Sequence, residues 1–242
     1  MVQNVLVPYD GSDLSKRALE VGIALSKRVG VDVRVLVFPA DSDDPSPSIS
    51  RELATAATEH GIEPVIISRQ RLGTVADEVL IEVAAVDDPL VCIGSHGRAR
   101  SAAYFGSVAT DLLQASTEPV LVCGPNVSVV EPTSLLAGPT VVAVDMSEGG
   151  RNVTPIAKGW VGQFEQDLET VTVHDGGFGR SEKAANVARS IVAECSSVGA
   201  SVLVMATHAP SGRQRFLEPS VTSEVVKRIS IPVLAAGPLV SM

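Results

Sequence analysis

The sequence predicts an α/β protein made of two tandem doubly wound parallel-sheet domains, the second of which lacks one helix–strand pair. Short apolar runs rich in β-branched residues alternate with segments of helical periodicity. Aromatic residues make up only 3% of the 242 residues, whereas 45% are hydrophobic. A core of Val, Leu, Ile and Ala suits parallel strands that are covered by helices on both faces. A segment near the middle of the chain also recurs near its end, which indicates an internal duplication.

The first half begins with a strand followed by a capped helix. Asn4–Pro8 (NVLVP) is a short apolar run typical of a buried strand. Asp10 opens a turn with N-cap chemistry, Leu14–Val29 has apolar residues at helical spacing, and Gly30 ends that helix. The further expected elements are the strand Val31–Phe38, a polar loop at Ala40–Ser50, the helix Glu52–His60, the strand Pro64–Ser68, the helix Val75–Ala85, the strand Leu90–Gly94, the helix Ser107–Ala115 and the strand Pro119–Cys123.

The second half repeats this alternation after a linker. Val127–Pro139 has no clear periodicity and contains two prolines, so we divide the chain into a domain at 1–126, a linker at 127–139 and a domain at 140–242. The elements expected there are the strand Thr140–Val144, the helix Asn152–Phe164, the strand Val171–His174, a glycine-rich turn at Gly176–Gly179, the helix Ser181–Ser196, the strand Ser201–Met205, the helix Ser220–Ile229 and the strand Pro232–Ala235.

The duplication can be aligned without a gap at its best-matching segment. Ser107–Pro125 and Ser220–Pro238 are identical at seven of nineteen positions. The stretch from Asp145 to Ser220, however, is shorter than the corresponding stretch from Asp10 to Ser107. The loss lies between the second strand of the second half and the helix at Ser181. The first half has a helix and a strand at that point, and we therefore expect the second half to lack this pair.

Charge and composition disfavour several classes of function. The net charge is −9, whereas a nucleic-acid-binding surface is normally basic. The N-terminal segment MVQNVLVPYD lacks the pattern of a signal peptide, and no apolar run reaches the roughly 18 residues that a membrane span needs. The three cysteines, Cys92, Cys123 and Cys195, form no CxxC pair and are interpreted as small buried residues of a reducing cytosol. We expect a cytoplasmic protein without nucleic-acid or membrane partners.

A glycine-bearing segment joins the fourth strand to the following helix. Gly94-Ser-His-Gly97 comes as the strand ends, and Gly106-Ser107 comes as the helix begins. Phosphate groups need the close approach of backbone N–H groups, which glycine permits because it has no Cβ. The start of a helix adds unsatisfied N–H groups and a partial positive charge. The segment therefore indicates a phosphate site, with an ordinary tight turn and an N-cap serine as the alternative.

Three segments together resemble the universal stress protein family. They are NVLVPYDGSDLSKRAL at 4–19, the strand Val31–Phe38 and the stretch Gly94–Pro125, which span nearly the whole first half. The ATP-binding members of that family carry Gly-2X-Gly-9X-Gly-Ser/Thr. This sequence has Gly94-2X-Gly97-8X-Gly106-Ser107, one residue shorter in the surface loop. The resemblance implies a Rossmann-like fold and a site for ATP or a related adenine nucleotide.

The resemblance also assigns roles to individual residues. Asp10 would contact the adenosine, the backbone around Phe38 would meet the adenine, and the glycine loop would hold the phosphates. Family strand order places the first and fourth strands side by side, at the switch point where open α/β sheets bind ligands. For Asp10, a turn or cap role remains the alternative. The predicted nucleotide-binding residues are Pro8, Tyr9, Asp10, Phe38, Gly94, Gly97, Arg98, Gly106, Ser107 and Val108.

The second half departs from this motif at every glycine. Ala206 and Ala209 place Cβ atoms where a phosphate would lie, and Pro219 removes a donor N–H. Asp145 and Ser220 remain in their equivalent positions. The sequence therefore predicts a nucleotide site in the first domain only.

No catalytic centre or metal site is predicted. His96 stands between two glycines, but no second base, nucleophile or metal ligand has supporting spacing near it. The signatures of ATP-dependent ligases and nucleotidyltransferases are absent. A receiver domain is disfavoured because Arg69 follows the third strand and Gly124-Pro125 the fifth, where it would need an aspartate and a lysine.

The sequence thus predicts a stress-response or regulatory protein that binds ATP or a related adenine nucleotide, alone or with Mg²⁺, with little or no catalysis. Slow ATP hydrolysis is left open. The alternative is a structural or interaction module of the same fold with a vestigial loop. Because the strands Pro119–Cys123 and Pro232–Ala235 would each leave an open edge, we expect them to meet in an intramolecular pseudo-dimer. A homodimer is left open.

Overall fold

The structure is a computed structural model that describes residues 2–38, 45–60, 65–68, 73–96, 106–128, 135–145, 148–173, 180–207 and 220–240. In the first half the elements are β1 (Asn4–Pro8), α1 (Asp13–Val29), β2 (Val33–Val37), α2 (Pro47–His60), β3 (Val65–Ser68), α3 (Val75–Ala84), β4 (Pro89–Gly94), α4 (Ser107–Ala115) and β5 (Val120–Cys123). In the second half they are β6 (Thr140–Val144), α5 (Glu148–Phe164), β7 (Leu168–Thr172), α6 (Arg180–Ser197), β8 (Val202–Ala206), α7 (Val221–Arg228) and β9 (Val233–Ala236).

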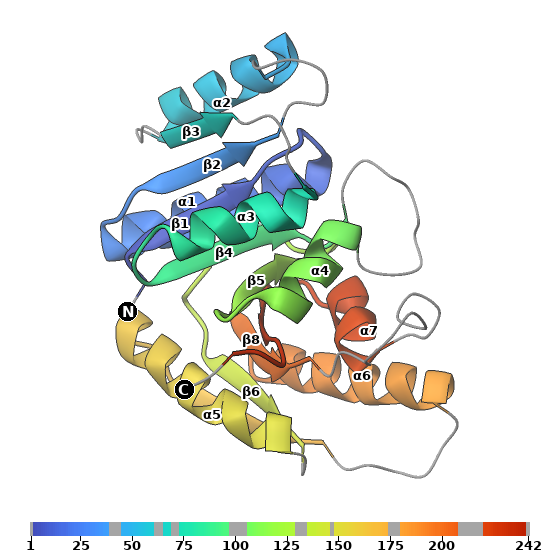
Figure 1. Ribbon diagram of the computed structural model, residues 1–242. Coiled ribbons are helices and arrows are strands. Elements are labelled where there is room, and N and C mark those ends of the chain that lie inside the picture. Colours follow the sequence, from blue (N-terminus) through green and yellow to red (C-terminus); the bar gives the residue numbers. More distant parts are fainter. Residues whose placement is uncertain are drawn as a thin grey trace.

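The strands of both halves form one sheet. Within the described ranges it has nine strands in the order β3-β2-β1-β4-β5-β9-β8-β6-β7 (Figure 1). Every pair is parallel except β5 with β9. Counted outward from that pair, the first half has its fifth, fourth, first, second and third strands in turn. The second half has the equivalents of the fifth, fourth, first and second strands in the same order and lacks the third. The predicted fold class is therefore confirmed, including the missing helix–strand pair. The domain division at residues 127–139 stays a proposal.

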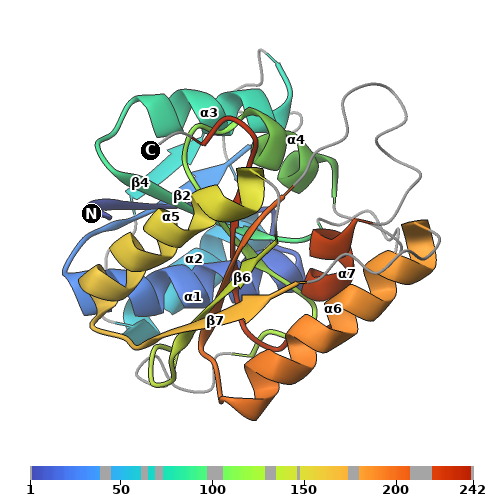
Figure 2. The ribbon, with the colours of Figure 1, turned by 90° about the horizontal axis from the view of Figure 1, so that it is seen from below.

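Two helix layers cover the two faces of the sheet. The alternation of side chains along β1 places Val5 and Val7 on one face and Leu6 on the other. Helices α1, α2 and α5 pack on the face of Val5. Helices α3, α4, α6 and α7 pack on the face of Leu6. In Figure 2, strand β6 lies between α5 and α6, as this arrangement requires. The core is almost wholly aliphatic, as the composition predicted.

Three elements, α2, α5 and β7, begin at least three residues earlier than the sequence predicted. Helix α2 starts at Pro47, inside the expected loop, because the Ser46 hydroxyl accepts a hydrogen bond from the N–H of Ile49 at 3.4 Å. Proline at the first helical position costs the helix nothing, since that N–H would be unsatisfied. Strand β7 covers Leu168–Thr172, where it pairs in register with the five residues of β6. The predicted strand end at His174 and the turn at Gly176–Gly179 lie outside the described residues.

The two halves join through the antiparallel pair of β5 and β9. Val120 lies opposite Ala235, and Val122 lies opposite Val233. The two strands that were predicted to meet do pair. The glycines that follow them, Gly124 and Gly237, occupy equivalent positions in the aligned repeat.

Each of these glycines packs against the backbone of a helix in the other half. A Cβ on Gly124 would lie 2.1 Å from the carbonyl oxygen of Val226 in α7. A Cβ on Gly237 would lie 2.0 Å from the carbonyl oxygen of Leu113 in α4. Real Cβ atoms do not approach a carbonyl oxygen so closely, so any side chain would force the helix away. These two contacts make the junction a pseudo-two-fold interface.

Contacts outside the sheet tie the halves together further. The side-chain amide of Gln163, near the end of α5, exchanges two hydrogen bonds with the backbone of Val2, at 2.7 and 3.0 Å. Figure 1 shows the N-terminus at that end of α5. On the same face, Arg28 of α1 pairs with Glu165 at 3.1 Å. This last pair is exposed and contributes little to stability.

We predict that alanine at either junction glycine destabilises the protein. Gly124→Ala and Gly237→Ala should each lower the free energy of unfolding by about 2–3 kcal/mol, since the new methyl group overpacks a helix backbone. Gly159→Ala is the matched control. It lies in α5 with nothing within 4 Å of its Cβ, and alanine there should stabilise the helix by up to about 1 kcal/mol. Urea denaturation measures all three. Equal stability of Gly124→Ala and the parent chain would contradict the packing described for the junction.

Candidate functional site

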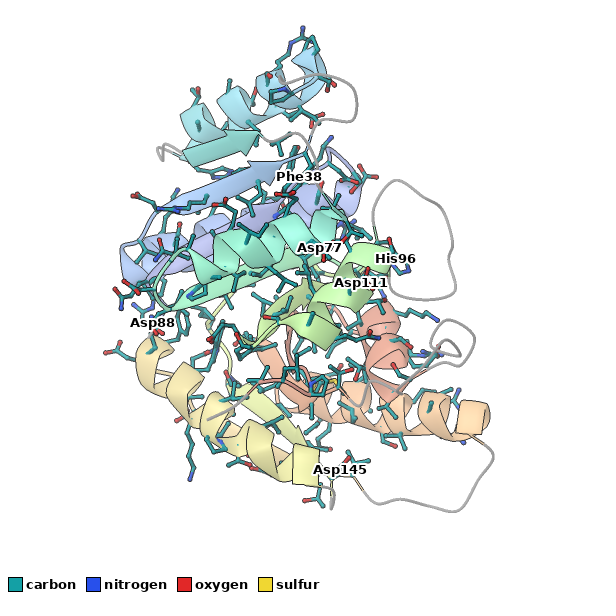
Figure 3. The ribbon with its side chains drawn as sticks, in the orientation of Figure 1. Phe38, Asp77, Asp88, His96, Asp111 and Asp145 are labelled. Carbon is teal, nitrogen blue, oxygen red and sulfur yellow. The ribbon has the colours of Figure 1, made fainter. Side chains whose placement is uncertain are left out.

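The candidate site lies at the carboxyl ends of β1, β2 and β4. From β1 the chain proceeds to β2 and β3 on one side, and β4 and β5 then extend the sheet on the other side. The sheet therefore has its switch point between β1 and β4, which is where ligands of open α/β sheets bind. In Figure 3, Phe38 after β2 and His96 after β4 lie on this side of the first half, whereas Asp88 lies at the opposite end of β4.

The structure brings the described residues of the predicted site to this one edge. Pro8 ends β1, with Tyr9 and Asp10 directly after it, and Phe38 follows β2. Gly94 ends β4, and Gly106, Ser107 and Val108 open helix α4. Gly97 and Arg98 lie outside the described residues.

Asp10 shapes the turn between β1 and α1. Its Oδ1 accepts a hydrogen bond from the N–H of Ser12 at 2.9 Å. Ser12 in turn caps α1, since its hydroxyl accepts from the N–H of Ser15 at 3.2 Å. Gly11, between them, has a φ of 78°, which favours glycine. Asp10 therefore stabilises the turn next to the switch point, which is the alternative to a ligand contact that the sequence analysis gave for this residue.

Tyr9 is buried and links three elements. Its hydroxyl donates to Oε2 of Glu52 in α2 at 2.7 Å. Oε1 of the same carboxylate pairs with the ammonium of Lys16 in α1 at 2.9 Å. The Tyr9 backbone N–H donates to the carbonyl of Leu36 at 2.9 Å. The sequence pointed to Tyr9 only as a ligand contact and gave no sign of Glu52, because the two residues lie far apart in the chain.

Gly94 is explained by packing between a helix and a strand. A Cβ at this position would lie 2.8 Å from both the backbone carbonyl carbon and the Cβ of Leu14 in the first turn of α1. Glycine at the end of β4 therefore lets α1 lie close over the switch point. The expectation from sequence was that this glycine admits a phosphate. The structure shows that it admits the helix backbone, and its contact with a phosphate stays a prediction.

The start of helix α4 is closed by backbone hydrogen bonds and has no side-chain cap. The N–H of Ser95 donates to the carbonyl of Cys123 at 2.9 Å, and the N–H of Gly106 donates to the carbonyl of Ser95 at 2.7 Å. The N-cap residue is Gly106, and the helical bonds begin with the N–H of Thr110. The N–H groups of Ser107, Val108 and Ala109 thus have no carbonyl partner within the helix.

The equivalent helix of the second half has a side-chain cap. Ser220 is the N-cap of α7, and its hydroxyl accepts from the N–H of Ser223 at 3.1 Å. The Ser223 hydroxyl accepts from the N–H of Ser220 at 3.1 Å, which completes a reciprocal capping box. The two helix starts therefore differ. Among the described residues, α4 begins at a glycine without a side-chain cap, whereas α7 begins at a serine whose hydroxyl accepts from the N–H of Ser223.

His96 lies beside this loop in a partly buried position. Its Nδ1 is 3.0 Å from the hydroxyl of Ser95. Its Nε2 is buried and has no hydrogen-bond partner among the residues that the structure describes. Partial burial, and then the positive charge of Lys227, lower the pKa of His96. The imidazole is therefore mainly neutral at pH 7, and no carboxylate in the described part of the chain orients it as a triad would.

Metal and thiol chemistry find no support in the described ranges. These hold no group of three or more His, Cys, Asp or Glu side chains that could bind a metal ion. All three cysteines are buried and free. Burial raises the pKa of Cys123 and of Cys195 to about 12, which keeps them as unreactive thiols. None of the described helices is long and apolar enough to cross a membrane.

Comparison with known proteins yields one family match. The model described as the universal stress protein family matches residues 1–124 and 177–236, that is, most of both halves. The unmatched stretch between them contains residues 127–139, β6, α5 and β7. A search of curated proteins finds no match.

Several solved structures share the fold over the whole chain. A functionally unknown protein from Pseudomonas aeruginosa is 16% identical with a TM-score of 0.66, over 98% of this chain and 93% of that one. A universal stress protein from Archaeoglobus fulgidus is 19% identical with a TM-score of 0.65, over 97% and 98%. A second Pseudomonas aeruginosa protein, titled a putative universal stress protein, is 15% identical with a TM-score of 0.60, over 98% and 94%.

We predict that the Tyr9 hydroxyl stabilises the fold through Glu52. Tyr9→Phe should lower the free energy of unfolding by about 1 kcal/mol, because it removes a partly buried hydrogen bond to a carboxylate. Glu52→Ala, which removes the acceptor, and the double variant complete a thermodynamic cycle, measured by urea denaturation. A coupling energy near zero would show that the two side chains do not interact in solution.

Proposed function

The chain belongs to the universal stress protein family, and from this membership we propose that its first half binds ATP or a related adenine nucleotide while its second half does not. The role is that of a stress-response or regulatory protein that senses the nucleotide. The alternative is a structural or interaction module of the same fold with a vestigial loop.

The observation that carries the proposal is the difference between the two helix starts. Helix α4 begins at the switch point with a glycine cap, and its first N–H groups have no partner within the helix. A phosphate group satisfies such donors and interacts favourably with the helix dipole. In α7 the capping box already uses one such donor, the N–H of Ser223. If the loop before α4 had lost its ligand, we would expect α4 to gain a side-chain cap like that of α7.

The remaining predicted contacts would place the nucleoside across the ends of β1 and β2. Asp10 is at the end of β1, and Phe38 is at the end of β2, half-buried against the layer of α3 and α4. By family resemblance, Asp10 contacts the adenosine and the backbone near Phe38 meets the adenine. Gly97 and Arg98 would complete the phosphate end. Mg²⁺, when bound, would neutralise phosphate charge.

The proposal includes little or no catalysis. A hydrolase needs a positioned base or an activated water. His96 has a lowered pKa, but its contact is with a serine hydroxyl and no acidic residue is bonded to it in the described structure. Nucleotide binding would then act by changing conformation or assembly rather than by turnover.

We predict one nucleotide per chain and a selective effect of a negative charge at the start of α4. Ser107→Asp should weaken ATP binding by more than about tenfold, because a carboxylate competes with phosphate for the same donors. Ser220→Asp, at the aligned position of the second half, should leave ATP binding unchanged, since Asp caps α7 as well as Ser does. Isothermal titration calorimetry measures stoichiometry and affinity together.

The same titrations can contradict the proposal. Two equal sites per chain would show that the second half also binds. The absence of binding at millimolar ATP would leave the structural module as the better description. Neither substitution is expected to lower the melting temperature, because an acidic residue in the first turn stabilises a helix.

We predict negligible turnover as well. With ATP and Mg²⁺ the rate of phosphate release should stay below about one per second, the low end of ordinary enzymes. His96→Gln should not change the residual rate. A faster reaction that His96→Gln abolishes would make this protein an enzyme.

A further inference from the structure

Helix α7 of the second half ends beside the candidate phosphate site of the first half. The N–H of Ser95, next to His96, is bonded to the carbonyl of Cys123 at the end of β5. Gly124 follows and packs directly on the carbonyl of Val226 in α7. Further along the same turn, the Asn126 amide donates to the carbonyl of Lys227 at 3.0 Å. A short series of contacts thus joins the loop after β4 to the last turn of α7.

That last turn carries two cations on one carboxylate. Glu224 pairs with the ammonium of Lys227 at 2.9 Å and with the guanidinium of Arg228. Burial would raise the pKa of Glu224, but the hydrogen bonds from Lys227 and Arg228 outweigh it, and the pKa is lowered. The carboxylate therefore stays ionised, and the three side chains together carry one net positive charge.

This charge reaches the site. The end of β5 lies opposite the start of β9, and Asn126 is bonded to Lys227, so the last turn of α7 lies at the same edge as His96. After burial, the positive charge of Lys227 is the second cause that lowers the pKa of His96. Figure 3 shows His96 beside the start of α4, with α7 directly below it. The Lys227 side chain is 23% exposed, so its charge is only partly screened by water.

We propose that Lys227, from the second half, supplies positive charge to the polyphosphate of the nucleotide bound in the first half. This inference rests on the proposed function and adds to it that the site is completed by the other half of the chain. The flexible four-carbon stem of lysine lets the ammonium contact both Glu224 and a phosphate oxygen.

The aligned repeat has this lysine in only one of its two copies. In the aligned repeat, the position in α4 that corresponds to Lys227 is Gln114, and the position that corresponds to Glu224 is Asp111. The first half therefore offers no lysine to the second half at the equivalent place. The cation faces the half that has the uncapped helix start.

The test compares three ligands and three variants. The ligands are ATP, adenosine and inorganic tripolyphosphate. Lys227→Met removes the charge but keeps the stem, Lys227→Arg keeps the charge, and Lys158→Met removes an exposed lysine from α5 as a charge-matched control. Lys227→Met should weaken ATP and tripolyphosphate by about tenfold, the loss expected for one bond between charged groups, and leave adenosine unchanged. Lys227→Arg should stay within about twofold of the parent chain, and Lys158→Met should match it.

A second measurement reports on the position of Lys227 without any nucleotide. The pKa of His96, measured by NMR titration of the histidine ring signals, should rise in Lys227→Met and stay unchanged in Lys158→Met. This readout also shows that the variant is folded, because a loosened α7 would alter the signals of the surrounding core.

The outcomes separate this inference from the proposed function. If the parent chain binds ATP and Lys227→Met binds ATP and tripolyphosphate equally well, the inference is wrong and the proposed function stands. If the parent chain binds tripolyphosphate but neither ATP nor adenosine, and Lys227→Met weakens it, the inference holds for polyphosphate anions and the adenine proposal fails. If none of the three ligands binds, both are wrong.

Discussion

The antiparallel pairing of β5 with β9 is the constraint on which the rest of this molecule depends. Each strand is the last of its half and would otherwise be an open edge, which exposes unpaired backbone groups to other chains. The pairing satisfies both edges at once and merges two small sheets into one. Side chains at the crossing would separate the strands from the helices behind them. Glycine at 124 and at 237 removes that obstacle on both sides, so α4 and α7 each press on a strand end of the other half.

This junction also determines which residues lie near the carboxyl ends of the strands of the first half. β4 and β5 are parallel, so the end of β5 lies next to the loop that follows β4. Any helix that packs on the end of β5 must therefore lie beside that loop. Through Gly124, the helix in that place is α7, which belongs to the other half. The charge that acts on His96 thus comes from Lys227, a residue of the second copy of the repeat.

Periodicity and duplication predicted the architecture, whereas contacts between distant residues could not be read from the sequence. The aligned repeat predicted the missing helix–strand pair, because equivalent segments fold alike. The open edges of the last strands predicted that these strands meet. The start of α2 was missed, since Ser46 and Pro47 stand in a polar stretch whose composition resembles a loop. The bond between Tyr9 and Glu52 joins residues far apart, and no local pattern reveals it. For Gly94, the sequence indicated a phosphate contact, which stays a prediction, and it gave no sign that α1 packs on this glycine.

Helices α4 and α7 come from one duplicated segment but begin in different ways. A helix start presents N–H donors that must be satisfied by side chains, water or a ligand. In α7, Ser220 and Ser223 satisfy one another, which stabilises the half without help from outside. In α4, Gly106 offers no such group, and its own N–H closes the loop onto Ser95. Among the described residues, no side chain caps α4, so the start of this helix lacks the free energy that such a bond contributes. The second half contacts the neighbouring end of β5, where Gly124 packs on α7 and Cys123 accepts from the N–H of Ser95. The copy with the capped helix thus packs beside the copy whose corresponding helix begins without a side-chain cap.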